Sequence, residues 1–154
     1  MSDLCFTPTH KLLAMLLARE ISAKELLEEF VTQTQRHNPI INALVTLNLD
    51  SARQRAAAID QLFTGNAQAV APLHGLPIAV KDVFATKGLR TTLGNPQFSH
   101  HVPAEDDILV AREKAAGVVI LGKSNTPDCA SGGITTNTIF SLTSNPWNTD
   151  DHQR

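Results

Sequence analysis

The sequence predicts an α/β fold. Two short apolar runs, residues 78–80 and 118–121, have the composition of buried strands. Between them lie an irregular stretch and a helix-like segment that ends at Gly117. A strand, a loop, a helix and a second strand in this order are typical of two parallel strands that are joined by a crossover helix.

Two amphipathic helices are expected near the N-terminus. Thr9 is expected to cap a helix over residues 10–19. Ser22-Ala23-Lys24-Glu25 has the capping-box pattern, in which the serine oxygen accepts a hydrogen bond from a free backbone amide and the glutamate reaches back. The helix that begins there is expected to end by Asn38-Pro39, because a proline disfavours the helical conformation of the residue before it.

A strand and a third helix are expected next. Residues 41–47 alternate imperfectly between apolar and polar side chains, which suits a strand that is buried on both faces. Residues 49–63 place their apolar side chains on one helical stripe, and Thr64-Gly65-Asn66 is expected to end that helix. A connecting loop over residues 68–72 then leads to the first apolar run.

Loops are expected to dominate the C-terminal half. Residues 83–99 contain glycines and a proline and show no clear period. Pro103 is expected in the first turn of a helix for which Gly117 is a fitting C-cap. From Gly122 onward the pattern is again that of loops, in which glycines allow the backbone to approach a ligand closely.

The composition excludes several classes of protein. Thirteen basic and fifteen acidic residues give a net charge of −2, and no basic block indicates binding to nucleic acid or to an anionic membrane. No apolar run reaches transmembrane length, and the N-terminus lacks the pattern of a signal peptide. Cys5 and Cys129 lie far apart and are interpreted as free thiols of a reducing compartment, so a cytoplasmic protein is expected.

Lys81 is the first candidate functional residue, because it comes directly after an apolar strand. An ammonium group that loses water there has a lowered pKa, so the lysine can be neutral and act as a base. The alternative is that Lys81 marks an exposed strand end and pairs with Asp82. The position of one lysine does not decide between these interpretations.

Four motifs together resemble the amidase signature family. They are HGLPIAVKD at residues 74–82, TTLGN at 91–95, PAEDDILVAREKAAGVVILGKSNTPD at 103–128 and NPWN at 145–148. The resemblance implies the N-terminal part of the amidase-signature fold, a mixed central β-sheet flanked by helices. It further implies a single incomplete domain, with the N-terminal helices in residues 1–64 and the start of the catalytic α/β core in residues 65–154.

The resemblance also implies a chemistry. Members of the family cleave a carbon–nitrogen amide bond to an acid and ammonia or an amine, through a relay of a lysine, a bridging serine in a cis peptide linkage and a nucleophilic serine. Lys81 matches the lysine, and its implied role is that of the base. Cys129, Ala130 and Ser131 match a loop that lines the acyl pocket. The implied ligand is a small-molecule amide, and no cofactor is implied.

One departure from the family pattern bears on activity. The glycine- and serine-rich signature that supplies both serines normally follows the Asn-Pro-Trp segment, and this sequence ends a few residues beyond Trp147. None of its serines stands in a matching context, so the isolated chain is expected to be an inactive N-terminal fragment of a hydrolase. Two alternatives remain: the glutaminase subunit of a tRNA-dependent amidotransferase, which needs partner subunits, and the non-catalytic half of a split enzyme, completed by a separate C-terminal chain.

Three rival sites are weaker. His100-His101 with Glu105 and Asp106 does not predict a metal site, because adjacent histidines rarely reach one ion. Cys129 is not expected to be a nucleophile, because the neighbouring Asp128 should raise the pKa of its thiol. Gly122-Lys123-Ser124 resembles the end of a phosphate loop, but the preceding run is a strand rather than a loop, so nucleotide binding is not expected.

Overall fold

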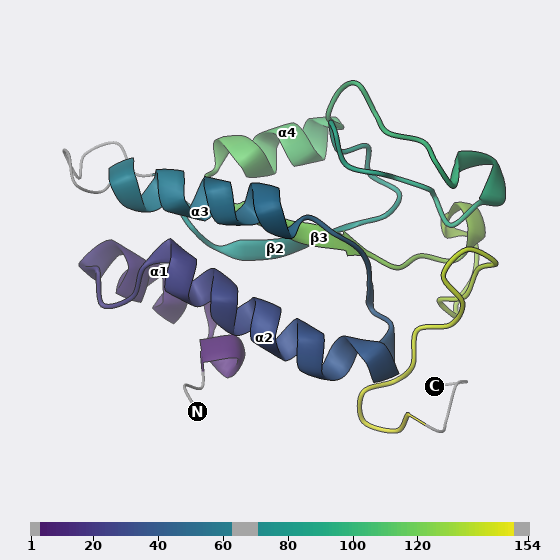
Figure 1. Ribbon diagram of the computed structural model, residues 1–154, viewed down its shortest axis with the longest axis horizontal. Coiled ribbons are helices and arrows are strands. Elements are labelled where there is room, and N and C mark those ends of the chain that lie inside the picture. The colour runs from purple at the N-terminus through teal and green to yellow at the C-terminus, as the bar shows by residue number, and fades with distance from the viewer. Residues whose placement is uncertain (1–3, 63–70, 150–154) are drawn as a thin grey trace.

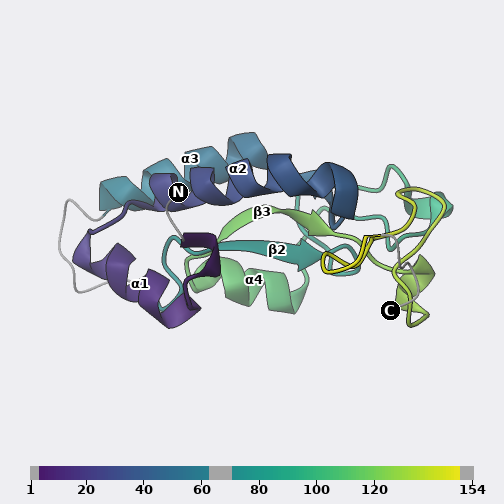
Figure 2. The same cartoon turned by 90° about the horizontal axis from the view of Figure 1, so that it is seen from below.

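The computed structural model describes residues 4–62 and 71–149, and it has a mixed three-stranded sheet with helices on both faces (Figures 1 and 2). The helices are α1 (Thr9–Ala18), α2 (Ala23–Ile41), α3 (Leu49–Leu62) and α4 (Ile108–Ala115), and the strands are β1 (Leu44–Leu47), β2 (Pro77–Lys81) and β3 (Val119–Ser124). Short 3₁₀ turns occur at Leu4–Phe6, Pro96–Phe98 and Asp128–Ala130. The predicted α/β fold is therefore confirmed. None of the helices in the described ranges is long and apolar enough to cross a membrane.

The strands are arranged in the order β1-β3-β2. β2 and β3 are parallel and are joined through α4, as the strand–loop–helix–strand order predicts. β1 pairs with the other side of β3 and is antiparallel to it, so the sheet is mixed. The carboxyl ends of β2 and β3 consequently lie at the same end of the sheet.

Strand β3 carries the core on both of its faces. Val119 and Leu121 pack with buried residues of α1, α2 and α3, whereas Val118 and Ile120 pack with Val80 of β2 and Val110 of α4. A continuous apolar run is what a strand covered on both sides requires, because its successive side chains point to opposite faces. Figure 2 shows the resulting layers, with α2 and α3 on one face of the sheet and α4 on the other.

The predicted capping box is present, and the predicted Thr9 cap is wrong. Ser22 Oγ accepts a hydrogen bond from the backbone N–H of Glu25 (3.1 Å), and Glu25 Oε2 accepts one from the backbone N–H of Ser22 (2.8 Å). Helix α1 instead has Pro8 at its N-cap and no side-chain cap, so Thr9 is its first helical residue. Proline presets a backbone dihedral that suits the start of a helix, which accounts for the shift.

Helix α2 does not end by Asn38-Pro39 but continues to Ile41, so β1 begins at Leu44 rather than at residue 41. Asn38 Oδ1 accepts hydrogen bonds from the backbone N–H groups of Ala43 (2.9 Å) and Leu44 (2.8 Å). Asn42 then ends the helix in the left-handed conformation, with φ of 55°. These contacts outweigh the one intrahelical bond that Pro39 cannot donate.

Two further boundaries differ from the predictions. Pro103 precedes α4, and Asp107 is its N-cap, because Asp107 Oδ1 accepts a hydrogen bond from the backbone N–H of Leu109 (3.0 Å). Strand β3 continues to Ser124, three residues beyond the predicted run, because pairing with both β1 and β2 extends that far. The predicted helix end at Thr64-Gly65-Asn66 and most of the 68–72 loop lie outside the described residues.

Candidate active site at the carboxyl end of β2

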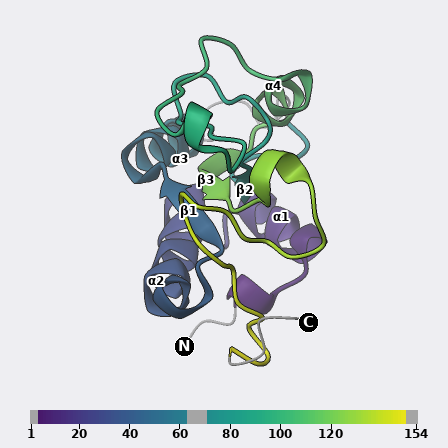
Figure 3. The ribbon, with the colours of Figure 1, turned by 90° about the vertical axis from the view of Figure 1, so that its right-hand side faces the viewer.

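Lys81 is the last residue of β2. The preceding Val80 is 3% exposed and packs in the core beneath α4, whereas Lys81, one residue further along the strand, is exposed. In the parallel pairing of the sheet Lys81 lies opposite Ser124 of β3. The loops that follow both strands gather at this end of the molecule (Figure 3), which is where open α/β sheets usually place their sites.

The solvent exposure of Lys81 differs from the expected loss of water at the strand end. The side chain of Lys81 is exposed, as the alternative interpretation of a solvent-exposed strand end expects. The other half of that alternative is wrong: no hydrogen bond or ion pair within the described ranges joins Lys81 to Asp82. The Asp82 carboxylate faces away from solvent and is bound elsewhere.

Asp82 anchors the turn that follows β2. It is fully buried, its Oδ2 accepts a hydrogen bond from the backbone N–H of Thr92 (3.1 Å) and another from the Thr92 hydroxyl, and its backbone N–H donates to the carbonyl of Ser124 (3.0 Å). Burial raises the pKa of this carboxyl, and the hydrogen bonds from Thr92 and the charges of Lys123 and Arg90 oppose the rise. Asp82 therefore fixes where the strand that carries Lys81 ends.

The desolvated lysine of this region is Lys123, which the sequence argument considered only as part of a phosphate loop. Its side chain is fully buried, and its Nζ donates hydrogen bonds to the carbonyl of Phe84 (2.5 Å) and to Thr86 Oγ1 (2.9 Å). Burial lowers the pKa of Lys123 to about 8, against the opposing charges of Asp82 and Asp106. No local sequence signal marks its burial, which follows from the pairing of β3 with both β1 and β2 and from the covering of both faces of the sheet.

The loop that contains Cys129, Ala130 and Ser131 is exposed and lies against the 91–95 turn. Cys129 and Ala130 have positive φ angles of 48° and 58°, which non-glycine residues rarely adopt. A Cβ added at Gly94 would lie 2.9 Å from the carbonyl oxygen of Thr126 and 2.8 Å from that of Pro127, so the turn and the loop are in backbone contact.

Cys129 has the electrostatics of a weak nucleophile. Although it is exposed, a hydrogen bond with Asp128, the cost of partial desolvation and the nearby Asp128 charge all raise the pKa of its thiol. The predicted effect of Asp128 is thus confirmed. Asn95 Nδ2 donates hydrogen bonds to Asp128 Oδ1 (2.9 Å) and Cys129 Sγ (3.6 Å) and so holds both side chains against the turn.

Backbone hydrogen bonds link the predicted site segments. The N–H of Leu93 donates to the carbonyl of Asp82 (2.9 Å), and the N–H of Cys129 donates to the carbonyl of Leu93 (2.8 Å). Leu93 therefore connects the end of β2 directly to the 129–131 loop. The structure brings Lys81 and the predicted pocket loop to one end of the sheet. Leu93 links them, because it is hydrogen-bonded both to Asp82, the residue after Lys81, and to Cys129.

Comparisons with known proteins match most of the chain and its fold. The family model described as Amidase matches residues 25–152. The chain is 38% identical over 138 residues to a subunit of the glutamyl-tRNA(Gln) amidotransferase of Heliobacterium modesticaldum, and the match covers 90% of this chain and 28% of that protein. The corresponding subunit of Roseiflexus castenholzii is 41% identical over 135 residues, covering 87% of this chain and 27% of that protein.

A solved structure agrees with the family match and with the fold. A bacterial aryl acylamidase of the amidase signature family superposes with a TM-score of 0.87 at 27% identity, covering 94% of this chain and 30% of that one. The chain thus spans less than a third of the length of the proteins that it resembles. Because the family match extends over most of the chain and the fold agrees with a solved member, this chain belongs to the amidase family.

Proposed function

We propose that this chain supplies the base of a site that hydrolyses carbon–nitrogen amide bonds, and that Lys81 is that base. The observation that carries the proposal is the position of Lys81, at the carboxyl end of a parallel strand and within the HGLPIAVKD motif. Its exposure leaves the amine accessible to groups that act with it. The ligand is a small-molecule amide, and the products are an acid and ammonia or an amine.

In the proposed relay the amine of Lys81 accepts a proton from a bridging serine. That serine accepts one from a nucleophilic serine, whose oxygen attacks the amide carbonyl. The acyl group is transferred to the nucleophile as the amine leaves with a proton, and water then releases the acid. None of the serines in this sequence stands in the context that the relay requires, so the 154 residues alone are proposed to be inactive.

We assign Cys129, Ala130 and Ser131 to the lining of the acyl pocket. Their exposure supports this assignment, as does the hydrogen bond through which Leu93 holds Cys129 close to the end of β2. A cytoplasmic location completes the proposal. It is supported by Cys5 and Cys129, which are both free thiols.

A second candidate is the glutaminase subunit of a tRNA-dependent amidotransferase. The names of the relatives at 38% and 41% identity favour it. The bond cleaved would then be the side-chain amide of glutamine, and the ammonia would pass to a companion subunit. Copurification of companion subunits with the full-length protein, together with glutaminase activity, distinguishes this candidate from a free-standing amidase or from half of a split enzyme.

The test is amide hydrolysis by the full-length protein that contains this sequence. Lys81→Ala is expected to lower kcat by about 10²- to 10⁴-fold, the contribution of a general base. Lys11→Ala, which removes an exposed amine from α1, is the matched control and is expected to leave kcat unchanged. Undiminished turnover by Lys81→Ala would refute the assigned role. Turnover by the isolated 154 residues that depends on Lys81 would refute their proposed inactivity.

A further inference from the structure

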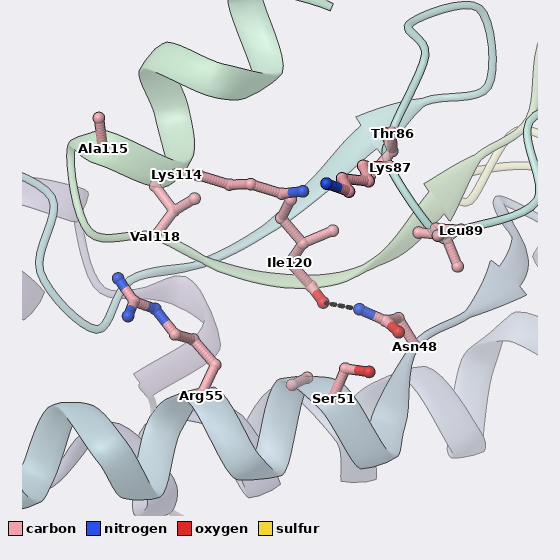
Figure 4. Close-up of a pocket in the computed structure, with 12 residues that line it drawn as sticks. Asn48, Ser51, Arg55, Thr86, Lys87, Leu89, Lys114, Ala115, Val118 and Ile120 are labelled. Carbon is pink, nitrogen blue, oxygen red and sulfur yellow. Dashed lines mark hydrogen bonds between the residues drawn. The ribbon is translucent and has the colours of Figure 1, made fainter. Parts of the chain in front are cut away.

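A cavity lies between α3 and α4, away from Lys81. Its volume is about 640 Å³, and Lys81 is not among its lining residues. Cavities that hold small molecules have volumes of about 300–1,000 Å³, with an apolar lining and a few converging polar groups. Figure 4 shows that its lining side chains come from α3, from the loop after β2, from α4 and from β3.

Among the residues that the structure describes, three cations line this cavity and no carboxylate does. Arg55 comes from α3, Lys87 from the loop after β2 and Lys114 from α4. Figure 4 shows Lys87 and Lys114 reaching over the same side of Ile120, with Arg55 rising from the opposite wall. Converging like charges repel one another, and an anion placed among them relieves that repulsion.

One carboxylate outside the lining holds two of these residues in place. Asp106 accepts hydrogen bonds from Lys114 Nζ (2.7 and 2.8 Å) and from the backbone N–H of Lys87 (2.7 Å). Burial alone would raise the pKa of Asp106, but these hydrogen bonds and the charges of both lysines together lower it. The single negative charge of Asp106 thus stands beside the two positive charges of Lys87 and Lys114. Arg55 takes part in no ion pair among the described residues.

The floor of the cavity is apolar. Leu89 (8% exposed), Val118 (2%) and Ile120 (7%) belong to the core beneath α4, and their edges line the cavity together with Ala52. Polar groups stand at the α3 side: Ser51, and Asn48, whose amide donates to the carbonyl of Ile120 (3.3 Å). The cavity therefore combines a hydrocarbon surface with a cationic rim.

We propose that this cavity is a binding site for an organic anion, a carboxylate that carries an apolar body. The carboxylate lies between Arg55 and the two lysines, and the apolar body contacts Leu89, Val118 and Ile120. The site is separate from the proposed amide-hydrolysing site and does not depend on it.

The test is a titration of the 154-residue chain with benzoate and, in parallel, with benzamide, a neutral molecule of nearly the same shape. Benzoate is expected to bind with a dissociation constant of about 1 mM or lower, and more weakly as salt is added. Arg55→Gln and Lys87→Gln, both at exposed positions, are each expected to weaken benzoate binding about 5-fold, the effect of one partly exposed charge pair. Amide NMR shifts at Ser51, Gly88 and Ala115 locate the bound molecule.

Arg112→Gln is the matched control, because Arg112 lies on α4 but does not line the cavity. It is expected to leave benzoate binding unchanged. Three results would each overturn the proposal: equal affinities for benzoate and benzamide, an equal loss of affinity in Arg112→Gln, and an absence of benzoate binding at 1 mM and above.

Discussion

The ammonium group of Lys123 donates a 2.9 Å hydrogen bond to the hydroxyl of Thr86, so a residue of β3 holds the loop that follows β2. The bond lies in a fully buried environment, where the loss of water lowers the pKa of Lys123 to about 8. A buried cation thus stands close to the strand end that carries Lys81.

The low pKa of Lys123 predicts a stability that rises with pH. Below pH 8 the folded chain carries a charge that burial disfavours. From about pH 8 to the unfolded value of 10.5 the folded lysine is neutral while the unfolded one is still protonated. The unfolded state then binds more protons, so the free energy of unfolding rises, by up to about 3 kcal/mol over this window.

The measurement is urea denaturation of the wild type and of Lys123→Met between pH 7 and pH 10.5. The two cysteine thiols have raised pKa values, which lower stability at high pH, but they do so in both proteins and cancel in the difference. Parallel pH profiles for the two proteins would show that Lys123 titrates alike in the folded and unfolded states.

Removal of the Thr92 hydroxyl should weaken the turn after β2. Thr92 Oγ1 donates to Asp82 Oδ2 and accepts a hydrogen bond from the N–H of Gly94 (3.0 Å), and both Thr92 and Asp82 are buried. Thr92→Val keeps the shape but leaves these groups short of a partner, at an expected cost of about 1–3 kcal/mol. Thr32→Val, at an exposed position of α2, should change the free energy of unfolding by less than about 0.5 kcal/mol.

Gly122 is a position where the sheet tolerates no side chain. A Cβ there would overlap the carbonyl oxygen of Thr46 in β1 and lie 3.1 Å from the Cα of Leu47, and these backbone atoms cannot move alone. Gly122→Ala is expected to destabilise the chain by about 1–3 kcal/mol or more, because β1 must move away from β3. Gly133→Ala, where a Cβ meets nothing within 4 Å, is the control for thermal unfolding. Equal melting temperatures for the two variants would contradict the packing of β1 on β3.

The capping box of α2 offers a prediction with an internal control. Ser22→Ala removes the cap and should cost about 1 kcal/mol of stability. Thr9→Ala should cost much less, because the Thr9 side chain caps nothing and alanine favours the helix. The measurement is chemical denaturation of both variants. A larger loss of stability in Thr9→Ala than in Ser22→Ala would contradict the assignment of the cap to Ser22.

Local patterns predicted the elements well where one physical effect dominates. The capping box at Ser22, the stripe of α3 and the apolar run of β3 all correspond to what forms. The errors lie where two effects compete. Pro39 alone would end α2, but the side-chain amide of Asn38 binds Ala43 and Leu44 and carries the helix past it.

The site was only partly predictable for the same reason. The motif that contains Lys81 is visible in the sequence, and so is the effect of Asp128 on Cys129. The burial of Lys123 is not, because it follows from long-range pairing of β3 with both β1 and β2 rather than from neighbours in sequence. Similarly, Asp82 binds Thr92, ten residues away, instead of the adjacent lysine.

The alternation of β2 ties the candidate base to the interior of the molecule. Val80 is buried and Lys81 is exposed, so a shift of the strand by a single position would push the ammonium into hydrocarbon and turn a valine toward water. Both changes are unfavourable, and they arise together. An insertion or deletion anywhere within β2 therefore cannot relocate the amine while sparing the core.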